Sequence, residues 1–191
     1  MVTNFYQLLA IFAIVVTGQS NARQTAFYIE ENNLLPNHTL INCAVGGSSI
    51  RDWQKGEIYY NQCLQMVSEA QADGYIVVGQ FHFQGERETA NQVRAEEYRR
   101  LTVAFFNKFR LHVGIVDTPL VFAQLGPQPT DTPRPYWGYV QTMQASIAGD
   151  FPQWTMITTS DITPYCPVEG PHWCGAGYAE IASRVIDALF D

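Results

Sequence analysis

Residues 8–21, LLAIFAIVVTGQSN, join an apolar run to a short polar motif, and this stretch decides the fold. The run from Leu8 to Val16 is rich in Ile and Val and is closed by Gly18, which is typical of a buried strand in a parallel sheet. It is about half of the ~20 residues that a membrane-spanning helix needs. No Lys or Arg precedes Arg23 and no small-residue cleavage site follows the run, so the marks of a signal peptide are missing. We therefore expect a strand that places Ser20 at a sheet edge, and no export signal.

The composition is that of a globular protein with an acidic surface. Of the 191 residues, 47% are hydrophobic and 15% are charged, and no repeat or low-complexity tract divides them, so we expect one domain over residues 1–191. The 18 Asp and Glu against 11 Lys and Arg give a net charge of -7, which argues against nucleic-acid binding because that needs a cationic surface. A neutral sugar or a small ester is easier to accept than a polyanion.

Apolar and amphipathic segments alternate along the chain. The segments predicted as strands are 11–17, 39–45, 75–81, 119–125 and 154–159. The segments predicted as helices are 24–32, 58–72, 89–112, 137–149 and 175–190. In the clearest helix, the residues expected on one face are Val93, Tyr98, Leu101, Phe105 and Phe109. This alternation implies right-handed crossovers and an α/β fold, in which helices cover both faces of a five-stranded parallel sheet.

In such a sheet, ligand sites form beyond the carboxyl ends of the strands. The segments at these ends are 18–21, 46–49, 82–86, 126–128 and the loop that carries Glu169 and His172. Reactive side chains of a site are therefore expected in these segments.

Ser20 follows a strand and a glycine and precedes a predicted helix, where its hydroxyl and its own N–H can face a ligand. A serine nucleophile needs a base, and the base needs an orienting carboxylate. The segment CPVEGPHWCGAGY, residues 166–178, supplies His172 as the base and Glu169, three residues earlier, as the carboxylate. Taken singly, an ordinary helix N-cap is the alternative for Ser20, and a loop histidine bonded to backbone is the alternative for His172.

Two further segments offer hydrogen-bond donors for an oxyanion. In NCAVGGSSIRDW, residues 42–53, the glycine pair lets the backbone turn sharply, so that the N–H of Gly47 can join that of Ser20. In FQGERE, residues 83–88, the amide of Gln84 is a candidate third donor. A plain tight turn is the alternative for the glycine pair. Glu86 is either a carboxylate at a helix N-terminus or an acid of the site.

Four aromatic side chains are candidates for an apolar rim on which a sugar could stack, with core packing as the alternative for each. They are Trp53, Phe83, Trp137 and Trp173.

The four cysteines have no CxxC spacing and no paired histidines, which argues against a zinc site. Cys166 and Cys174 are close enough to bridge a loop in an oxidising compartment, where the bridge would clamp the loop that carries Glu169 and His172. Buried free thiols are the alternative. Asn37-His38-Thr39 is a glycosylation sequon, which matters only in a secretory pathway.

Four motifs, in this order, resemble those of the SGNH-type hydrolases, and more narrowly those of the sialate O-acetylesterase and acetylxylan esterase group of carbohydrate esterases. They are TGQSNA (17–22), AVGGSSIRDW (44–53), QGERE (84–88) and EGPHWCGAGYAEIA (169–182). The resemblance implies a three-layer α/β/α sandwich with a flavodoxin-like sheet, no cofactor, and an acetylated carbohydrate such as O-acetylated sialic acid or xylan as substrate. It also implies Ser20 as nucleophile, Gly47 and Gln84 as oxyanion donors, and His172 as general base. It is compatible with action outside the cell, and a cytoplasmic location is the alternative.

Two departures from the family pattern keep alternatives open. Glu169 stands where the family has aspartate. Because its side chain is longer, it can orient His172 only if its backbone lies further from the imidazole ring. If it does not, Glu86 or a water orients His172 instead. His82-Phe83 replaces the usual pair before the QGE motif. A catalytically impaired carbohydrate-binding module on the same scaffold is therefore one alternative function, and an SGNH lipase or thioesterase is another. Ala22 stands at the second glycine of GxSxG, so the α/β-hydrolase elbow is absent.

Overall fold

The computed structural model describes residues 11–130, 134–162 and 170–191. Its strands are β1 (Ile11–Gly18), β2 (His38–Asn42), β3 (Tyr75–Phe83), β4 (Leu120–Ala123) and β5 (Trp154–Ile157). All four pairings are parallel and the spatial order is β2-β1-β3-β4-β5, so the predicted five-stranded parallel sheet is confirmed. From Ile11 on, the first apolar run forms β1, which lies between β2 and β3 with both of its edges paired.

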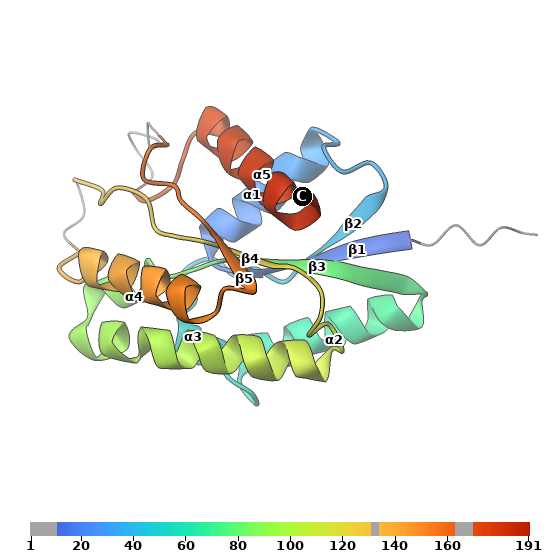
Figure 1. Cartoon of the computed structure of the whole chain (residues 1–191), viewed down its shortest axis with the longest axis horizontal. Coiled ribbons are helices and arrows are strands. Elements are labelled where there is room, and N and C mark those ends of the chain that lie inside the picture. Colours follow the sequence, from blue (N-terminus) through green and yellow to red (C-terminus); the bar gives the residue numbers. More distant parts are fainter. Residues whose placement is uncertain (1–10, 131–133, 163–169) are drawn as a thin grey trace, which may run out of the picture.

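Helices lie on both faces of the sheet (Figure 1). Their bounds are α1 (Ser20–Glu31), α2 (Ile58–Ala72), α3 (Gln92–His112), α4 (Trp137–Asp150) and α5 (Gly175–Phe190), with short 3-10 helices η1 (Ile50–Trp53) and η2 (Glu88–Ala90). The first and last helices, α1 and α5, pack together on one face, and α2, α3 and α4 lie on the other. The chain thus has the predicted three layers, and none of the helices among these described residues is both long and apolar enough to cross a membrane.

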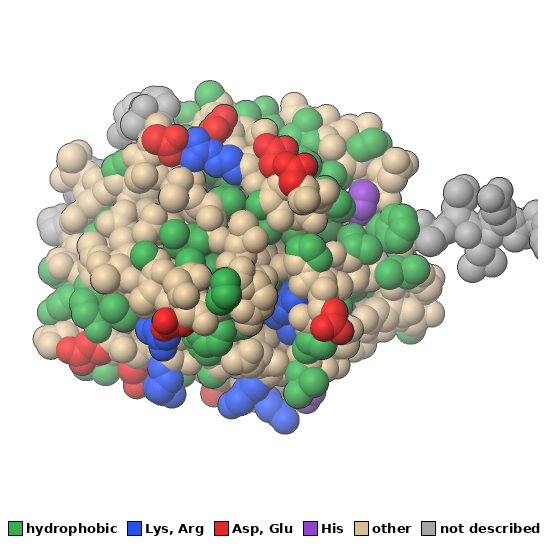
Figure 2. Space-filling model, in the orientation of Figure 1, with side chains coloured by type: hydrophobic (Ala, Val, Ile, Leu, Met, Phe, Trp, Pro, Cys, Tyr) green, Lys and Arg blue, Asp and Glu red, His purple; other side chains and the backbone are tan. Residues whose placement is uncertain are grey.

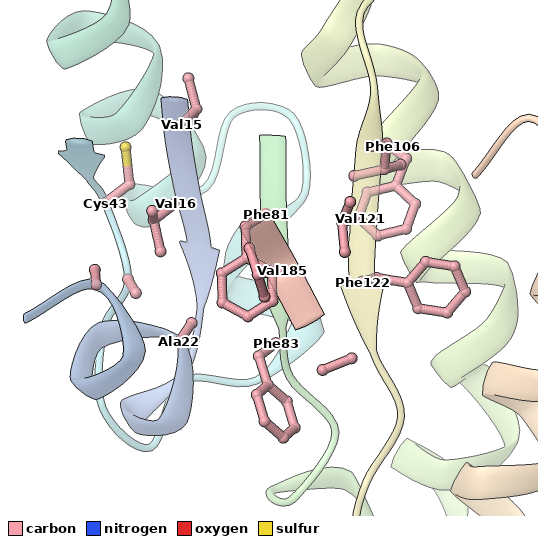
Figure 3. Close-up of a cluster of buried hydrophobic side chains, with 14 of the residues drawn as sticks. Val15, Val16, Ala22, Cys43, Phe81, Phe83, Phe106, Val121, Phe122 and Val185 are labelled. Atoms are coloured by element: carbon pink, nitrogen blue, oxygen red, sulfur yellow. The ribbon is translucent and has the colours of Figure 1, made fainter. Parts of the chain in front are cut away.

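The core follows from the two apolar faces of the sheet. Figure 3 shows side chains of the strands and of both helical layers in one apolar cluster, among them Val16, Phe81, Phe106 and Val185. Residues at successive positions of β1 are buried because helices cover both of its sides. This burial explains why the strand has an unbroken apolar sequence instead of an alternating one.

One residue of the clearest helix was placed on the wrong face. Tyr98, Leu101, Phe105 and Phe109 are buried as predicted, but Val93 is 55% exposed and Ala95 is buried in its stead. The step from Val93 to Tyr98 is five residues, which is about 140° beyond a full turn of an α-helix.

Cys43, directly after β2, forms a disulfide with Cys63 on α2, 20 residues further on. No bridge between these two cysteines was predicted from the sequence. The bridge closes the segment that carries the glycine pair, and such closure limits the freedom of the unfolded chain. Cys166 lies outside the described residues, so the clamp between Cys166 and Cys174 stays a prediction.

Candidate active site

The turn from β1 to α1 is built on a close backbone approach. Gly18 has a φ of +116°, and a Cβ on it would lie 2.1 Å from the carbonyl oxygen of Phe83 on β3. The next N–H, that of Gln19, donates to the same carbonyl at 2.8 Å. Only glycine fits this position. Ser20 follows as the first residue of α1, at the carboxyl edge of the sheet.

Ser20 and His172, which are 152 residues apart in the chain, contact each other at this edge. The distance from Ser20 Oγ to His172 Nε2 is 2.7 Å, that of a hydrogen bond. The helix-cap alternative for Ser20 is wrong, since Gln19 occupies the N-cap position and no side chain caps the helix.

The loop of His172 is held by its neighbours on either side. The Trp173 ring packs against the ring of Phe83, with centroids 5.6 Å apart, and its Nε1 donates to the carbonyl of Ile162 at 3.3 Å. A Cβ on Gly177 would lie 2.6 Å from the Trp173 side chain, so the helix that follows leaves room for the indole only because that residue is glycine. On the other side, the Pro171 carbonyl accepts a hydrogen bond from Asn21 at 3.1 Å.

Asn21 is the residue that ties these segments together, and the sequence analysis assigned it no role. Its Nδ2 donates to Glu86 Oε1 at 2.7 Å as well as to Pro171, and its Oδ1 accepts from the Tyr178 hydroxyl at 2.9 Å. The side chain is buried, so it joins α1, the segment after β3, the His172 loop and α5 inside the protein. The sequence feature that could have pointed to Asn21 is its position directly after Ser20 in the TGQSNA motif.

Glu86 is a buried acid beside the site. Burial raises the pKa of its carboxyl to about 7, while the hydrogen bond from Asn21 and the positive charge of Arg134 oppose that rise. Its Oε2 is buried and has no hydrogen-bond partner among the described residues. Glu86 precedes η2 and α3 instead of starting them, and it lines the cavity described below. Its side chain hydrogen-bonds to Asn21 and not to His172.

Gln84 has a different setting from the one predicted for it. It is completely buried, and its Nε2 donates to Glu88 Oε2. Glu88 also accepts from Ser49 Oγ at 2.8 Å and from the Ile50 N–H at 2.9 Å, and burial raises the pKa of its carboxyl. Glu88 was not predicted as part of this region, because no local sequence pattern marks an acid four residues after Gln84 as buried.

Gly47 and the candidate reactive side chains face one cavity of about 220 Å³. Gly47 has a φ of +69° and open space where a Cβ would stand, as a sharp turn toward a ligand requires. The lining residues are Gln19, Ser20, Gly47, Glu86, Arg87, Arg134, Pro171 and His172. Within the described parts of the chain, no group of three or more His, Cys, Asp and Glu side chains could hold a metal ion.

The four aromatic residues predicted for a sugar-stacking rim are core residues instead. Trp53, Phe83, Trp137 and Trp173 are at most 2% exposed, and none lines the cavity described above. The indole N–H groups of Trp53 and Trp137 donate to Ser48 Oγ and to the Gly126 carbonyl inside the protein. Bonds of this kind make full burial of an indole favourable.

His82, at the end of β3, is buried as well. Its ring packs edge-on against Phe106, its Nδ1 lies 3.0 Å from Thr17 Oγ1, and burial lowers its pKa to about 3. It is a neutral core residue and not part of the cavity wall. Glu169, the predicted orienting carboxylate, lies outside the described residues.

A family model described as "Carbohydrate esterase, sialic acid-specific acetylesterase" matches residues 22–190 of the chain. The matched segment begins two residues after Ser20 and includes His172. No curated protein sequence matches the chain.

Solved structures share the fold at low sequence identity. A protein from Arabidopsis thaliana has a TM-score of 0.77 at 12% identity, with 94% of this chain and 98% of that one covered. A carbohydrate acetylesterase from Xanthomonas citri has a TM-score of 0.64 at 15% identity; 94% of this chain is covered, but only 56% of that one. The native aryl esterase of M. smegmatis has a TM-score of 0.64 at 9% identity, with 94% and 100% covered. At these identities the likeness shows the fold alone.

Proposed function

Because the chain belongs to the carbohydrate esterase family of sialic acid-specific acetylesterases, we propose that it is a serine esterase that removes acetyl or another short acyl group from a carbohydrate hydroxyl. The observation that carries this proposal is the 2.7 Å contact between Ser20 Oγ and His172 Nε2 on a cavity that both residues line. A hydroxyl becomes a nucleophile only when a base can take its proton, and an imidazole nitrogen at this distance can do so.

In the proposed reaction, Ser20 Oγ attacks the ester carbonyl carbon while His172 Nε2 takes the hydroxyl proton. The tetrahedral intermediate collapses as the bond to the sugar oxygen breaks, and His172 gives its proton to that oxygen. Water then attacks the acyl-enzyme, His172 takes a proton from the water, and the acid leaves as Ser20 recovers its hydrogen.

For the oxyanion we propose the N–H groups of Ser20 and Gly47. Ser20 opens α1, where backbone N–H groups lack partners within the helix, and Gly47 lines the same cavity. Removal of one oxyanion donor typically costs about 3 kcal/mol of transition-state stabilisation. Gln84 is not assigned to this role, because its amide donates to Glu88 and it does not line the cavity.

Glu169 stays the proposed orienting carboxylate, because it precedes His172 by three residues in the sequence. Glu86, the alternative acid, hydrogen-bonds to Asn21, and Asn21 in turn binds the loop at Pro171. We therefore assign Glu86 an indirect part, that of positioning the loop through Asn21.

The test is hydrolysis of p-nitrophenyl acetate, and of an acetylated sugar, by the wild type and by Ser20→Ala. We expect the substitution to lower kcat by about a thousandfold or more, because Ser20 carries the one hydroxyl among the described residues that line the cavity. Ser68→Ala is the matched control, since Ser68 is an exposed serine on α2 that bonds only within its helix.

Equal, near-background rates in the wild type and in Ser20→Ala would contradict the proposal. They would favour the carbohydrate-binding module. A rate that rises steadily with acyl chain length would favour a lipase or thioesterase instead.

A further inference from the structure

The sequon Asn37-His38-Thr39, the only N-x-S/T sequence in the chain, lies on the surface of the protein. Asn37 and Thr39 are exposed, and Asn37 stands in a turn where the His38 N–H donates to the Leu35 carbonyl at 3.0 Å. Neither the Asn37 amide nor the Thr39 hydroxyl has a hydrogen-bond partner among the described residues. Both side chains that define an N-glycosylation acceptor are therefore accessible.

The Cys43–Cys63 disulfide indicates the kind of compartment in which the chain folds. It joins the end of β2 to α2 over a sequence separation of 20, and both cysteines are buried, so the bridge is part of the core. Structural disulfides are typical of the secretory pathway and of secreted proteins, and they are rare in the cytosol. A sequon is used in that same pathway.

The sequon lies at an open edge of the sheet. Asn37 directly precedes β2, which is the last strand on its side, and among the described residues β2 pairs only with β1. An open edge is a template on which another chain can add a strand, and proteins commonly block it with charged side chains. No Asp, Glu, Lys or Arg occurs between Glu31 and Arg51, so β2 and its flanking turns carry no such charge.

The opposite edge of the sheet, formed by β5, is different. Directly after this strand, the Thr158 carbonyl accepts a hydrogen bond from Arg184 Nη1 at 2.7 Å. The same guanidinium pairs with Asp161 and Glu180, and Figure 2 shows adjacent positive and negative side chains over α5. None of the ion pairs found among the described residues involves the segment of β2.

Apolar side chains adjoin the sequon as well. The Phe190 ring, at the end of α5, is 5.0 Å from the His38 ring between centroids, and Phe190 is 47% exposed. Leu34, in the turn before the sequon, is also exposed. A hydrophilic group on Asn37 would thus stand beside both an open strand edge and exposed apolar side chains.

We propose that Asn37 carries an N-linked glycan, and that this glycan covers the open edge of β2. In the transfer, which the cell's oligosaccharyltransferase catalyses, Asn37 Nδ2 attacks C1 of the first N-acetylglucosamine of a polyprenyl diphosphate-linked oligosaccharide. The new C1–N bond replaces the C1–O bond to the diphosphate, which leaves with the electron pair, and Nδ2 loses one proton to the transferase. The bulky, hydrophilic oligosaccharide then prevents a second chain from approaching β2.

The glycan would not block the cavity that contains Ser20. His38 pairs with Phe12 near the start of β1, whereas Ser20 follows the other end of that strand. Six residues of strand at about 3.3 Å each place roughly 20 Å between these two ends. The reaction at the cavity can therefore be measured with and without the glycan.

The first measurement expresses the full chain behind a cleavable secretion leader in human cells. Medium and cell lysate are both treated with peptide N-glycosidase F and compared on denaturing gels. We expect the wild type and Thr39→Ser, which keeps the sequon, to shift to a lower mass, whereas Asn37→Gln and Thr39→Ala should not shift. Peptide mass spectrometry should find Asn37 converted to aspartate in the treated wild type.

The second measurement compares the aggregation of secreted Thr39→Ser, Thr39→Ala and Thr39→Lys by light scattering, below the unfolding temperature of each. Thr39→Ala, which lacks the glycan, should aggregate about twofold or more faster than Thr39→Ser. Thr39→Lys also lacks the glycan but puts a charge on β2, so it should aggregate as slowly as Thr39→Ser. Hydrolysis of p-nitrophenyl acetate should be the same in all three.

A wild type that keeps its mobility after glycosidase treatment in both fractions would overturn the glycan, since the transfer occurs during synthesis and does not depend on later secretion. Equal aggregation of Thr39→Ala and Thr39→Ser would overturn the cover of β2. Aggregation of Thr39→Lys as fast as that of Thr39→Ala would overturn it too, because a charge on an exposed strand edge should block pairing. Absence of hydrolysis in every variant would contradict the esterase and leave these two readouts unchanged.

Discussion

Ser20 and His172 meet at one edge of the sheet, but they are positioned by different means. The turn before Ser20 is fixed by backbone, since Gly18 approaches the Phe83 carbonyl too closely for a side chain and Gln19 N–H binds that carbonyl. The loop of His172 is held by side chains of several elements, among them Asn21 on α1 and the Trp173 ring against β3. Substitutions in the turn before Ser20 should therefore mainly lower the stability of the fold. Substitutions that loosen the His172 loop should mainly lower the activity.

The largest effect is expected from Gly18→Ala. Its Cβ would lie 2.1 Å from the Phe83 carbonyl oxygen, and its φ of +116° is one that alanine rarely adopts. We expect the free energy of unfolding to decrease by about 3 kcal/mol or more, because β1 and β3 must separate to admit the methyl group. Urea unfolding followed by circular dichroism measures this.

Gly138→Ala is the matched control for that substitution. Gly138 lies within α4, and a Cβ there meets nothing within 4 Å. The protein should become more stable by up to about 1 kcal/mol, as is usual for glycine to alanine inside a helix. If both variants lost similar stability, the close approach at Gly18 would not be what fixes the turn.

The next effect concerns Glu86, which connects the two regions through Asn21. Its pKa is about 7 in the folded protein against 4.5 for a free carboxyl, so the folded state binds the proton more tightly than the unfolded state does. This contribution to stability is fully present below about pH 4.5 and is lost as the pH rises to about 7 and above. Between about pH 4.5 and pH 7, the free energy of unfolding of the wild type should therefore decrease by up to about 3 kcal/mol relative to that of Glu86→Gln.

Urea unfolding of the wild type and Glu86→Gln at several pH values between 4 and 8 tests this shift. Glu69→Gln, an exposed acid on α2, is the control and should follow the wild type. If the free energies of unfolding of the wild type and Glu86→Gln changed in parallel with pH, Glu86 would have the same pKa in the folded and the unfolded chain, which contradicts the prediction.

The smallest effect on stability, but a clear one on rate, is expected from Asn21→Ala. The substitution removes the hydrogen bonds to Glu86 and to the Pro171 carbonyl, and also the one that the Tyr178 hydroxyl donates to Asn21. We expect a loss of about 1–2 kcal/mol in the free energy of unfolding and a decrease in kcat of about tenfold or more, because His172 is no longer held against Ser20.

Asn32→Ala controls for the loss of an asparagine amide, since Asn32 is exposed and bonds only within its own turn. It should leave kcat unchanged. A kcat for Asn21→Ala equal to that of Asn32→Ala would mean that the His172 loop keeps its position without the amide, and that the two regions are independent.

By itself, the sequence determined the order of elements and the edge where the site lies. Apolar runs and helical spacing are local patterns, so the strands, the helices and the parallel sheet could be predicted from them. The rule that sites lie at the carboxyl ends of parallel strands then brought Ser20 and His172 together, and the structure shows their hydrogen bond. The boundaries of β2, β4 and β5 were less accurate, because the pairing between strands decides where a strand ends.

Only the tertiary structure decided which polar and aromatic side chains reach the cavity. Trp53 and Trp137 are buried in the core, where their N–H groups donate to Ser48 Oγ and to the Gly126 carbonyl. The net charge favoured a neutral ligand, whereas the structure places Arg87 and Arg134 among the residues that line the cavity. Burial, pairing of charges and the Cys43–Cys63 bridge all depend on residues far apart in the chain, and no local pattern records which of them will meet.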